Sequence, residues 1–488
     1  MSSFDIAIIG AGFGGIGAAV RLKQAGFDDF SVLEQSDDVG GVWCANTYPG
    51  LTCDIPSHLY SFSFALNPDW PDTFSSRQEI WAYLRSCTDR FGIRPHLRLG
   101  HKVHETTWDD REQCWRLSTT RGTFTARVVI NAIGALSDPS IPDIPGLGSF
   151  QGTIFHSSRW RHDHDLTGRR VAVIGTGASA IQFIPQIAPQ VGKLTVFQRT
   201  PPWVVPRRGR PISSMERLVY RNVPGAQRLV RAAIYWGRET MALGFLYPNL
   251  SRRAQQKAVA HLERQVPDPA LRAKLTPAYG FGCKRVLLSN DYYPALVRDN
   301  VELVVDRIGQ VRPHAVVTAD GAEHAVDTII FGTGFHVTDP AFPRYVRGPG
   351  GRTLADAWTP TMRSYLGTMV AGFPNLFLML GPNTGLGHTS VVLMMESQLH
   401  HIIAALRHMQ RTGTRAIAPV PEAQERFSAY IDAKLAGTVW TAGGCTSWYL
   451  DANGHSPSIW PGFANSFRRR LRRFQPADYQ AAPVLKEV

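Results

Sequence analysis

Two segments of the chain repeat one pattern, in which an apolar run, a glycine-rich turn and an amphipathic stretch lead to a second apolar run. In the first segment, residues 5–9 are followed by Gly10, Gly12 and Gly15 in the order G-x-G-x-x-G. Such glycines provide a tight turn, close approach to a pyrophosphate and close packing of a helix on a strand. The pattern therefore predicts a strand, a helix and a second strand over residues 30–33, the parts of a Rossmann-type dinucleotide-binding unit.

The same pattern returns over residues 169–199, where Gly175, Gly177 and Ala180 form the turn. Alanine is an accepted third residue of this motif. Two prolines fall in the helix that follows, and because proline removes a backbone donor, we expect this helix to be shortened or kinked. The chain is therefore predicted to be an α/β protein with two Rossmann-type dinucleotide-binding domains.

The residue that ends the second strand differs between the two units. Glu34 stands 24 residues after Gly10, and Arg199 stands 24 residues after Gly175. A carboxylate suits free ribose hydroxyls, whereas a guanidinium can bind a 2′-phosphate in bidentate fashion. We therefore predict FAD in the first unit and NADPH in the second. For Arg199, an ordinary surface arginine remains the alternative.

Two further apolar runs indicate how these units are connected. Residues 128–134 and 328–334 are rich in β-branched side chains and end at glycine, where backbone can come close to a cofactor. Their spacing suggests that the NADPH unit is inserted into the FAD domain, and the sequence between them contains a stretch with helical periodicity. We predict an FAD-binding domain over 1–140 and 340–488, an NADP-binding domain over 150–206 and 283–335, and a helical insertion over 207–282.

Composition excludes several other classes of protein. We find no run of the roughly 20 apolar residues that a membrane span needs, and the start of the chain lacks a basic segment and room for a cleavable signal, which predicts a cytoplasmic protein. The net charge is +13, but the basic residues are spread along the chain, so nucleic acid is not expected as a partner. The dense run Arg468–Arg473 is interpreted as a solvated helix face.

Six scattered cysteines include no CxxC pair, so we expect neither a disulfide framework nor a zinc site, and no bound metal. A pyridine-nucleotide disulfide reductase needs a close redox pair near the flavin. Cys44 and Cys53 are too far apart in sequence to form the usual pair, so this class of enzyme is not favoured.

Between the two units lies the motif Phe150-x-Gly152-x-x-x-His156-x-x-x-Trp160. It resembles the fingerprint of type I Baeyer–Villiger monooxygenases, FxGxxxHxxxW, and departs from the extended form at Arg161, where Pro or Asp is usual. We assign His156 and Trp160 to positioning the linkers between domains rather than to chemistry.

The resemblance covers nearly the whole chain and implies a set of cofactor contacts in addition to the glycine turns. It points to Val42, Trp43, Asp54 and Tyr60 at the cofactors, to Val103, whose backbone would hold the adenine, and to Arg199 and Thr200 at the 2′-phosphate. With the motif residues, the expected cofactor-binding residues are Gly10, Gly12, Phe13, Gly14, Gly15, Glu34, Val42, Trp43, Asp54, Tyr60, Val103, Gly175, Thr176, Gly177, Ala178, Ser179, Ala180, Arg199 and Thr200.

The resemblance also implies the chemistry. NADPH would reduce FAD, and the reduced flavin with O2 would give a C4a-peroxyflavin that converts a small-molecule ketone to an ester or lactone. Lys284 and Arg285 resemble the pair that contains the family's active-site arginine. Arg285 would favour the anionic peroxide, and Asp54 would orient its guanidinium.

Two other functions remain open at this point. A flavin monooxygenase that oxygenates nitrogen or sulfur in amines or sulfides shares both dinucleotide motifs. A noncatalytic binding module is the other alternative, which a yellow protein that consumes NADPH would exclude. Aromatic residues near the C-terminus occupy the region of a substrate-side loop in the family, with burial in a core as the alternative role. These residues are Trp440, Trp448, Tyr449 and Trp460.

Overall fold

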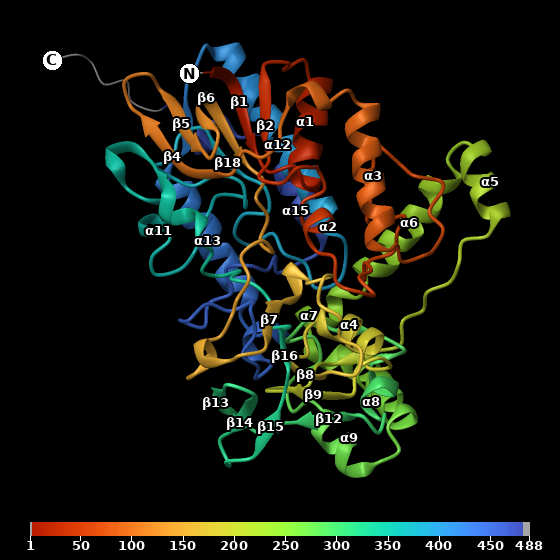
Figure 1. The fold of residues 1–488 in the computed structure, drawn as a ribbon. Helices are drawn as coiled ribbons and strands as arrows, with labels where there is room; N and C mark the ends of the chain where they lie inside the picture. Colours follow the sequence, from red (N-terminus) through yellow and green to blue (C-terminus); the bar gives the residue numbers. More distant parts are fainter. Residues whose placement is uncertain (1, 482–488) are drawn as a thin grey trace.

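The computed structural model describes residues 2–481, which form two layers built on β-sheets, a mixed sheet above a parallel one in Figure 1. The upper sheet has the strand order β17-β4-β5-β6-β1-β2-β3, with β18 beside β6. Helices α1 (Phe13–Gln24), α3 (Arg77–Arg90) and α12 (Val391–Thr412) pack beside it. Its strands are β1 (Ser2–Ile9), β2 (Phe30–Leu33), β3 (Leu97–Arg98), β4 (Val103–Asp109), β5 (Cys114–Thr119), β6 (Gly122–Asn131), β17 (Val346–Arg347) and β18 (Leu376–Leu378).

The lower sheet is entirely parallel and has the order β12-β9-β8-β16-β7. Its core is built largely from β-branched and aliphatic side chains on both faces, as expected for a parallel sheet that is covered on both sides. Helices α4 (Ala180–Ile187) and α10 (Tyr292–Leu296) pack on one face. The strands are β7 (Thr153–His156), β8 (Arg170–Ile174), β9 (Lys193–Phe197), β12 (Val301–Val304) and β16 (Thr328–Phe331).

Both predicted strand–helix–strand units are present. In the upper unit, α1 is followed by Gly26 in the left-handed conformation (φ 86°), as expected for a glycine that ends a helix. In the lower unit, α4 has 8 residues against 12 in α1, with Pro185 inside the helix and Pro189 just beyond its end. The prediction of a shortened helix is therefore confirmed.

The chain contributes strands to the upper sheet both before and after the strands of the lower sheet. Strands β1 to β6 precede the lower sheet in sequence, whereas β17 and β18 follow it, and β18 pairs with β6. The segments 128–134 and 328–334 each lie against a glycine turn: a Cβ on Gly10 would stand 2.8 Å from the Ala132 carbonyl oxygen, and one on Gly175 would stand 2.5 Å from that of Gly332. Each crossing therefore passes next to a predicted dinucleotide site.

The chain leaves the lower layer after β10 (Val204–Val205) and returns to it at β11 (Leu287–Leu288), and these two strands pair with each other. A group of helices lies between them in sequence. The two N-terminal helices of the group, α5 and α6, project to the right in Figure 1. The group consists of α5 (Ser214–Asn222), α6 (Ala226–Glu239), α7 (Ala242–Leu246), η4 (Pro248–Ser251), α8 (Arg252–Gln265) and α9 (Pro269–Leu275).

Short elements complete the two layers and the C-terminal part. The strands are β13 (Ile308–Arg312), β14 (Ala315–Thr318), β15 (Glu323–Ala325), β19 (Ile417–Pro419) and β20 (Tyr479–Ala481), and the helices are α2 (Val42–Ala45), α11 (Leu354–Ala357), α13 (Pro421–Leu435), α14 (Val439–Ala442) and α15 (Ala464–Leu471). Single 3₁₀ turns are η1 (Arg94–His96), η2 (Leu147–Ser149), η3 (Ser157–Arg159), η5 (Phe342–Tyr345), η6 (Pro349–Gly351) and η7 (Pro476–Asp478).

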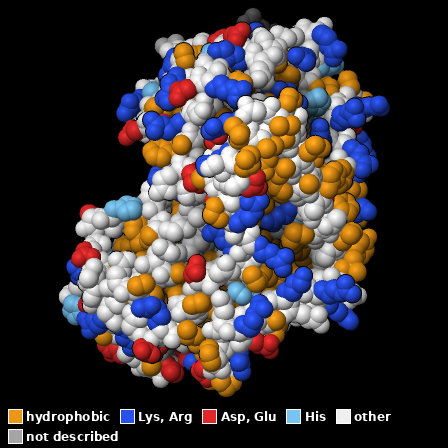
Figure 2. Space-filling view, turned by 90° about the vertical axis from the view of Figure 1, so that its right-hand side faces the viewer, with side chains coloured by type: hydrophobic (Ala, Val, Ile, Leu, Met, Phe, Trp, Pro, Cys, Tyr) orange, Lys and Arg blue, Asp and Glu red, His pale blue; other side chains and the backbone are white. Residues whose placement is uncertain are grey.

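Basic side chains are distributed over the molecular surface. Figure 2 shows them mixed with acidic and apolar side chains across one face. In α15, Phe467 and Leu471 are buried while Arg468, Arg469 and Arg470 are exposed, so this part of the run is the solvated helix face that was predicted, and Arg472 and Arg473 lie exposed just beyond the helix. Among residues 2–481, no helix is both long and apolar enough to cross a bilayer, and no cluster of His, Cys, Asp or Glu is placed to bind a metal.

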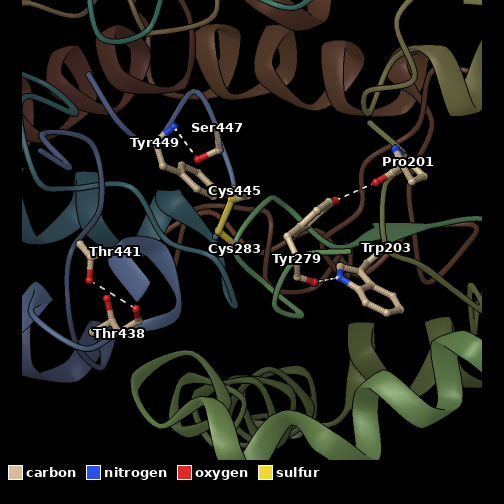
Figure 3. Close-up of a disulfide and its surroundings, with 9 residues drawn as sticks. All are labelled: Pro201, Trp203, Tyr279, Cys283, Thr438, Thr441, Cys445, Ser447 and Tyr449. Atoms are coloured by element: carbon tan, nitrogen blue, oxygen red, sulfur yellow. Dashed lines mark hydrogen bonds between the residues drawn. A yellow bond between two sulfur atoms is a disulfide. The ribbon is translucent and has the colours of Figure 1, made fainter. Parts of the chain in front are cut away.

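The prediction that the cysteines form no disulfide is wrong for one pair. Cys283 and Cys445, which are 162 residues apart in sequence, form a disulfide between the segment before β11 and the segment after α14 (Figure 3). Cys44, Cys53, Cys87 and Cys114 are free thiols. Sequence spacing missed the pair because only tertiary packing brings these two segments together.

Candidate active site

The first glycine turn is closed against the end of β6. Gly10 has a φ of 98°, which L-residues with a side chain rarely adopt. A Cβ on Gly15 would lie 1.8 Å from the Gly10 carbonyl oxygen, so α1 can pack on the turn only with glycine there. No side chain caps the N-terminus of α1 at Gly12, which leaves the backbone N–H groups of its first turn free to bind a phosphate.

The Glu34 carboxylate lies at the same turn. It is 5% exposed, and its Oε2 atom accepts a hydrogen bond from the Ala11 N–H at 2.6 Å. Its Oε1 atom accepts one from the Ser36 N–H at 2.8 Å. Because each carboxylate oxygen can accept two hydrogen bonds, both oxygens can also accept one from a ribose hydroxyl. The structure therefore places Glu34 where the sequence predicts it.

Three of the predicted flavin contacts come together beside α1. The Trp43 Nε1–H donates a hydrogen bond to the Tyr60 hydroxyl at 3.2 Å, and the rings of Phe13 and Tyr60 meet edge to face at 5.0 Å. Burial raises the pKa of Tyr60, so its hydroxyl stays protonated. Val42 opens α2 next to Trp43, and Val103 opens β4 as a buried residue.

The second glycine turn repeats this geometry in the lower layer. Gly175 has a φ of 106°, and Ala180 is fully buried against Gly332. Gly177 and Ala178 are exposed, so the outer side of the turn is open. The Thr176 hydroxyl donates a hydrogen bond to the Thr200 carbonyl oxygen at 3.4 Å, and no side chain caps α4 at Ser179, so backbone N–H groups at this end remain free for a phosphate.

Arg199 lies just beyond β9, and its charge acts on Lys284 of the segment before β11. Arg199 is exposed, and Lys284 is half-buried with its ammonium 5.2 Å from the centre of the Tyr279 ring. Burial lowers the pKa of Lys284, and the neighbouring Arg199 charge lowers it further. Neither side chain forms an ion pair within residues 2–481. Two adjacent unpaired cations suit a doubly charged phosphate, and sequence reasoning had assigned Lys284 no role.

Arg285 and Asp54 form an ion pair between segments 231 residues apart in sequence. The Arg285 Nε and Nη2 atoms lie 2.7 and 2.6 Å from the Asp54 Oδ2 atom. The two side chains are 26% and 30% exposed, so the pair is largely shielded from solvent but still accessible to it. The Asp54 charge raises the pKa of Arg285 against the opposing effect of burial, which keeps the guanidinium charged.

A second guanidinium that sequence reasoning missed faces this pair from α6. Arg238 is half-buried, and its guanidinium makes no hydrogen bond or ion pair with the described residues. Burial lowers its pKa, Asp54 raises it and Arg285 lowers it, so the Arg238 charge interacts with both groups of the pair. The signal in the sequence was the spacing of polar residues at i, i+4, i+7 and i+8 along one face of α6. These residues are Arg231, Tyr235, Arg238 and Glu239.

Glu239 ties α6 to the C-terminal part of the chain. Its buried carboxylate accepts hydrogen bonds from the His388 Nε2 atom at 3.2 Å and from the Ala464 and Asn465 N–H groups at the start of α15. Tyr235 donates a further hydrogen bond to it. Burial works against ionisation, but these hydrogen bonds together hold the pKa of Glu239 below its ordinary value.

The fingerprint residues lie at the junction of the two layers. The His156 ring meets the Phe335 ring edge to face at 5.6 Å, just past the second crossing, and burial lowers its pKa. Trp160 packs on Phe183 of α4. Arg161, where the motif departs from the family, is exposed and pairs with Asp163. The departure therefore leaves the buried part of the motif unchanged.

The C-terminal aromatic residues divide between the two roles considered for them. Trp440, Tyr449 and Trp460 are at most 2% exposed and belong to one core with Cys283, whereas Trp448 is 44% exposed. Tyr449 also lies near Arg285, and the charge of the guanidinium opposes the rise in the pKa of its hydroxyl that burial causes.

Comparisons with known proteins give a consistent result. The family model described as "Pyridine nucleotide-disulphide oxidoreductase" matches residues 7–214. A "Baeyer-Villiger monooxygenase" of Streptomyces coelicolor is 51% identical over 477 residues, which cover 97% of this chain and 92% of that protein.

Two solved structures are similar over nearly the whole chain. The crystal structure of OTEMO in complex with FAD and NADP matches with a TM-score of 0.88 at 28% identity and covers 98% of this chain and 99% of that one. A cyclohexanone-bound cyclohexanone monooxygenase matches with a TM-score of 0.84 at 30% identity, with coverage of 98% and 99%.

Proposed function

The chain belongs to the Baeyer–Villiger monooxygenases, and we propose that it converts a ketone to an ester or lactone with Arg285 as the charged group at the reaction centre. The enzyme uses FAD as its cofactor and NADPH and O2 as co-substrates. One oxygen atom enters between the carbonyl carbon and its neighbour, the other leaves as water, and NADPH provides the two electrons. The Arg285–Asp54 pair is the observation that carries the assignment of the site.

The residues of the upper layer fit FAD. The uncapped start of α1 suits the pyrophosphate, and Glu34 retains acceptor capacity for ribose hydroxyls beside it. Phe13, Trp43 and Tyr60 provide a buried aromatic wall next to the same turn. Bound FAD, once reduced by NADPH, supplies the activation of O2. We assign 1–140 and 340–488 to the FAD-binding domain, which the interleaved order of strands supports.

The lower layer fits NADPH. Gly175 and Gly177 leave backbone N–H groups at an uncapped helix start for the pyrophosphate, and the Arg199–Lys284 pair suits the 2′-phosphate. We assign 150–206 and 283–335 to the NADP-binding domain and 207–282 to a helical insertion. Strands β7 to β9, β12 and β16 support the first assignment, and helices α5 to α9 support the second.

Arg285 stabilises negative charge on the activated oxygen as it attacks the ketone carbonyl. A fixed cation in a partly desolvated site can lower such a barrier by several kcal/mol. Asp54 orients the guanidinium and keeps it charged, and Arg238 adds positive charge from α6. The same field disfavours the protonated oxygen that transfers electrophilically to sulfur or nitrogen. A ketone is therefore the expected substrate class, in agreement with the cyclohexanone bound in a structural relative.

The test compares ester and sulfoxide formation in the purified holoenzyme. Cyclohexanone and a methyl aryl sulfide are supplied in parallel with NADPH and ¹⁸O2, and products are identified by mass spectrometry. The expected ester contains one ¹⁸O atom. Arg285→Ala should retain both cofactors but lose ester formation by a factor of about 10² or more, with a smaller loss of sulfoxide.

Asp54→Ala should shift the same product ratio in the same direction but more weakly, because it removes only the orienting partner. An Arg285→Ala enzyme that forms ester at the wild-type rate would remove Arg285 from the mechanism. A wild-type enzyme that yields sulfoxide and no ester from any ketone would instead favour the heteroatom-oxygenating alternative.

A further inference from the structure

The Cys283–Cys445 disulfide joins two segments that both reach the candidate active site. Cys283 directly precedes Lys284 and Arg285, and Cys445 lies four residues before Tyr449. Figure 3 shows the disulfide between these segments, with the Tyr449 ring on the same side as Cys445. Cys283 is fully buried, whereas Cys445 is partly exposed. The bond is therefore placed next to the catalytic arginine and is accessible from one end.

The stretch around Cys445 has few other attachments, whereas residues 456–460 further along are held by hydrogen bonds to Asn383 and Gly385. Residues 443–463, here called the C-terminal loop, lie between α14 and α15 and contain no helix or strand. The Gly443 carbonyl oxygen accepts a hydrogen bond from the Gly280 N–H at 2.8 Å. Within the described chain, residues 444–448 make only local hydrogen bonds, such as that from the Tyr449 N–H to the Ser447 hydroxyl at 3.3 Å. The disulfide is thus the direct attachment of this stretch to the arginine segment.

Tyr449 follows this stretch directly and is buried in the core that contains Cys283. Its hydroxyl is buried and makes no hydrogen bond of good geometry within the described residues, and its polar neighbour there is the Arg285 guanidinium. Burial raises the pKa of Tyr449, and the Arg285 charge opposes that shift. Asp54 and Tyr449 therefore both lie against the guanidinium, one as an ion pair and one as a buried phenol. An unpaired buried hydroxyl is costly unless it serves a ligand or holds a neighbour in place.

We propose that the Cys283–Cys445 disulfide is a positioning element of the oxygenation, which holds Tyr449 beside Arg285 and limits the access of water to the guanidinium. This inference rests on the proposed role of Arg285. With the disulfide intact, the C-terminal loop stays closed over the arginine. With both cysteines reduced, the stretch 444–448 is released, more solvent reaches the site, and NADPH oxidation separates from ester formation. The uncoupled reaction is NADPH + H⁺ + O2 → NADP⁺ + H2O2.

The switch between the two forms is a thiol–disulfide exchange with an external dithiol. A thiolate of the dithiol attacks the Sγ atom of Cys445, the partly exposed residue of the pair, forms a mixed disulfide and releases Cys283 as a thiolate that takes up a proton. The second thiol of the reagent then attacks its own sulfur in the mixed disulfide and frees Cys445. Two electrons and two protons have moved to the protein, and the reagent has become a disulfide.

The experiment uses the FAD-loaded enzyme before and after treatment with dithiothreitol. Peptide mapping after alkylation reports whether Cys283 and Cys445 are joined, and the ratio of ester to NADPH oxidised reports coupling. We expect the reduced enzyme and Cys445→Ser to lose at least about tenfold in this ratio, with peroxide formed instead, because small displacements of positioning groups have effects of that size. Chymotrypsin should also cut after Trp448 faster in the reduced form. Cys114→Ser, which removes a partly exposed free thiol, is the matched control.

Three outcomes would overturn the inference. Mapping could find both thiols free in enzyme alkylated at lysis, coupling could be equal in the joined and reduced forms, or chymotrypsin could cut both forms at one rate. If Arg285→Ala abolishes ester formation while Cys445→Ser does not, only the role of the disulfide is refuted. If Arg285→Ala leaves ester formation intact, the proposed function of the arginine fails first. Cys445→Ala, which adds no hydroxyl, separates loss of the bond from effects of the new side chain.

Discussion

Arg199 and Lys284 are the two cations that we expect to hold the 2′-phosphate of NADPH. A hydrogen bond to a charged group contributes about 1.5–3 kcal/mol, which corresponds to roughly 10- to 150-fold in affinity. Arg199 is exposed and therefore screened by salt, so Arg199→Ala should fall near the lower end of this range. Lys284 is half-buried, so Lys284→Met should fall near the upper end. Affinity for NADH should change little in either variant.

The double variant gives a sharper test of the same site. Arg199 lowers the pKa of Lys284, which shows that the two cations repel each other when no phosphate lies between them. Removing one cation relieves the repulsion on the other, so the remaining cation should bind the phosphate more strongly. The loss of affinity in each single variant should therefore be partly offset. The loss in binding free energy in the double variant should therefore exceed the sum of the two single losses.

The assay is the dissociation constant of each coenzyme, measured on the oxidised enzyme at two salt concentrations. Arg469→Ala, at an exposed position of α15, is the matched control. Equal losses for NADPH and NADH in Arg199→Ala would refute the assignment of the phosphate site. Additive losses would show that the two cations do not share one phosphate.

Three further predictions concern flavin retention and stability. Glu34→Ala should be isolated partly free of flavin, since it removes the acceptor beside the first glycine turn, and unchanged flavin retention on dilution would contradict this role. Glu239→Gln should lower the free energy of unfolding by about 1–3 kcal/mol, because at least one buried donor loses its charged acceptor. Denaturant titration measures this loss, with Glu263→Gln at an exposed position as the control. Burial lowers the pKa of His401 to about 4, so between pH 6.5 and 4 the unfolded chain binds a proton that the folded chain excludes. Stability should fall by about 3 kcal/mol as pH decreases through that window, and His401→Gln should flatten the profile unless another group dominates it.

The sequence by itself determined the parts of the fold that depend on local relations along the chain. The glycine turns, the strands beside them and the shortened α4 each follow from the steric demands of residues within about 30 positions of one another. The acid or base at the end of the second strand is likewise a local feature, because strand length and helix length fix its distance from the turn. For this reason Glu34 is found at the first turn, where it was expected.

Tertiary structure alone decided which distant residues share the site. Arg285 and Asp54 are separated by 231 positions, and Cys283 and Cys445 by 162. Sequence spacing over such distances does not indicate whether two residues meet, so neither contact could be worked out from local pattern. The family resemblance pointed to the first pair, and nothing in the sequence pointed to the second. Arg238 was missed for the same reason, since the partners of a helix face depend on how that helix packs. Side chains that enter one site from three separate segments are brought together by burial of the cores beneath them, which is a property of the whole chain.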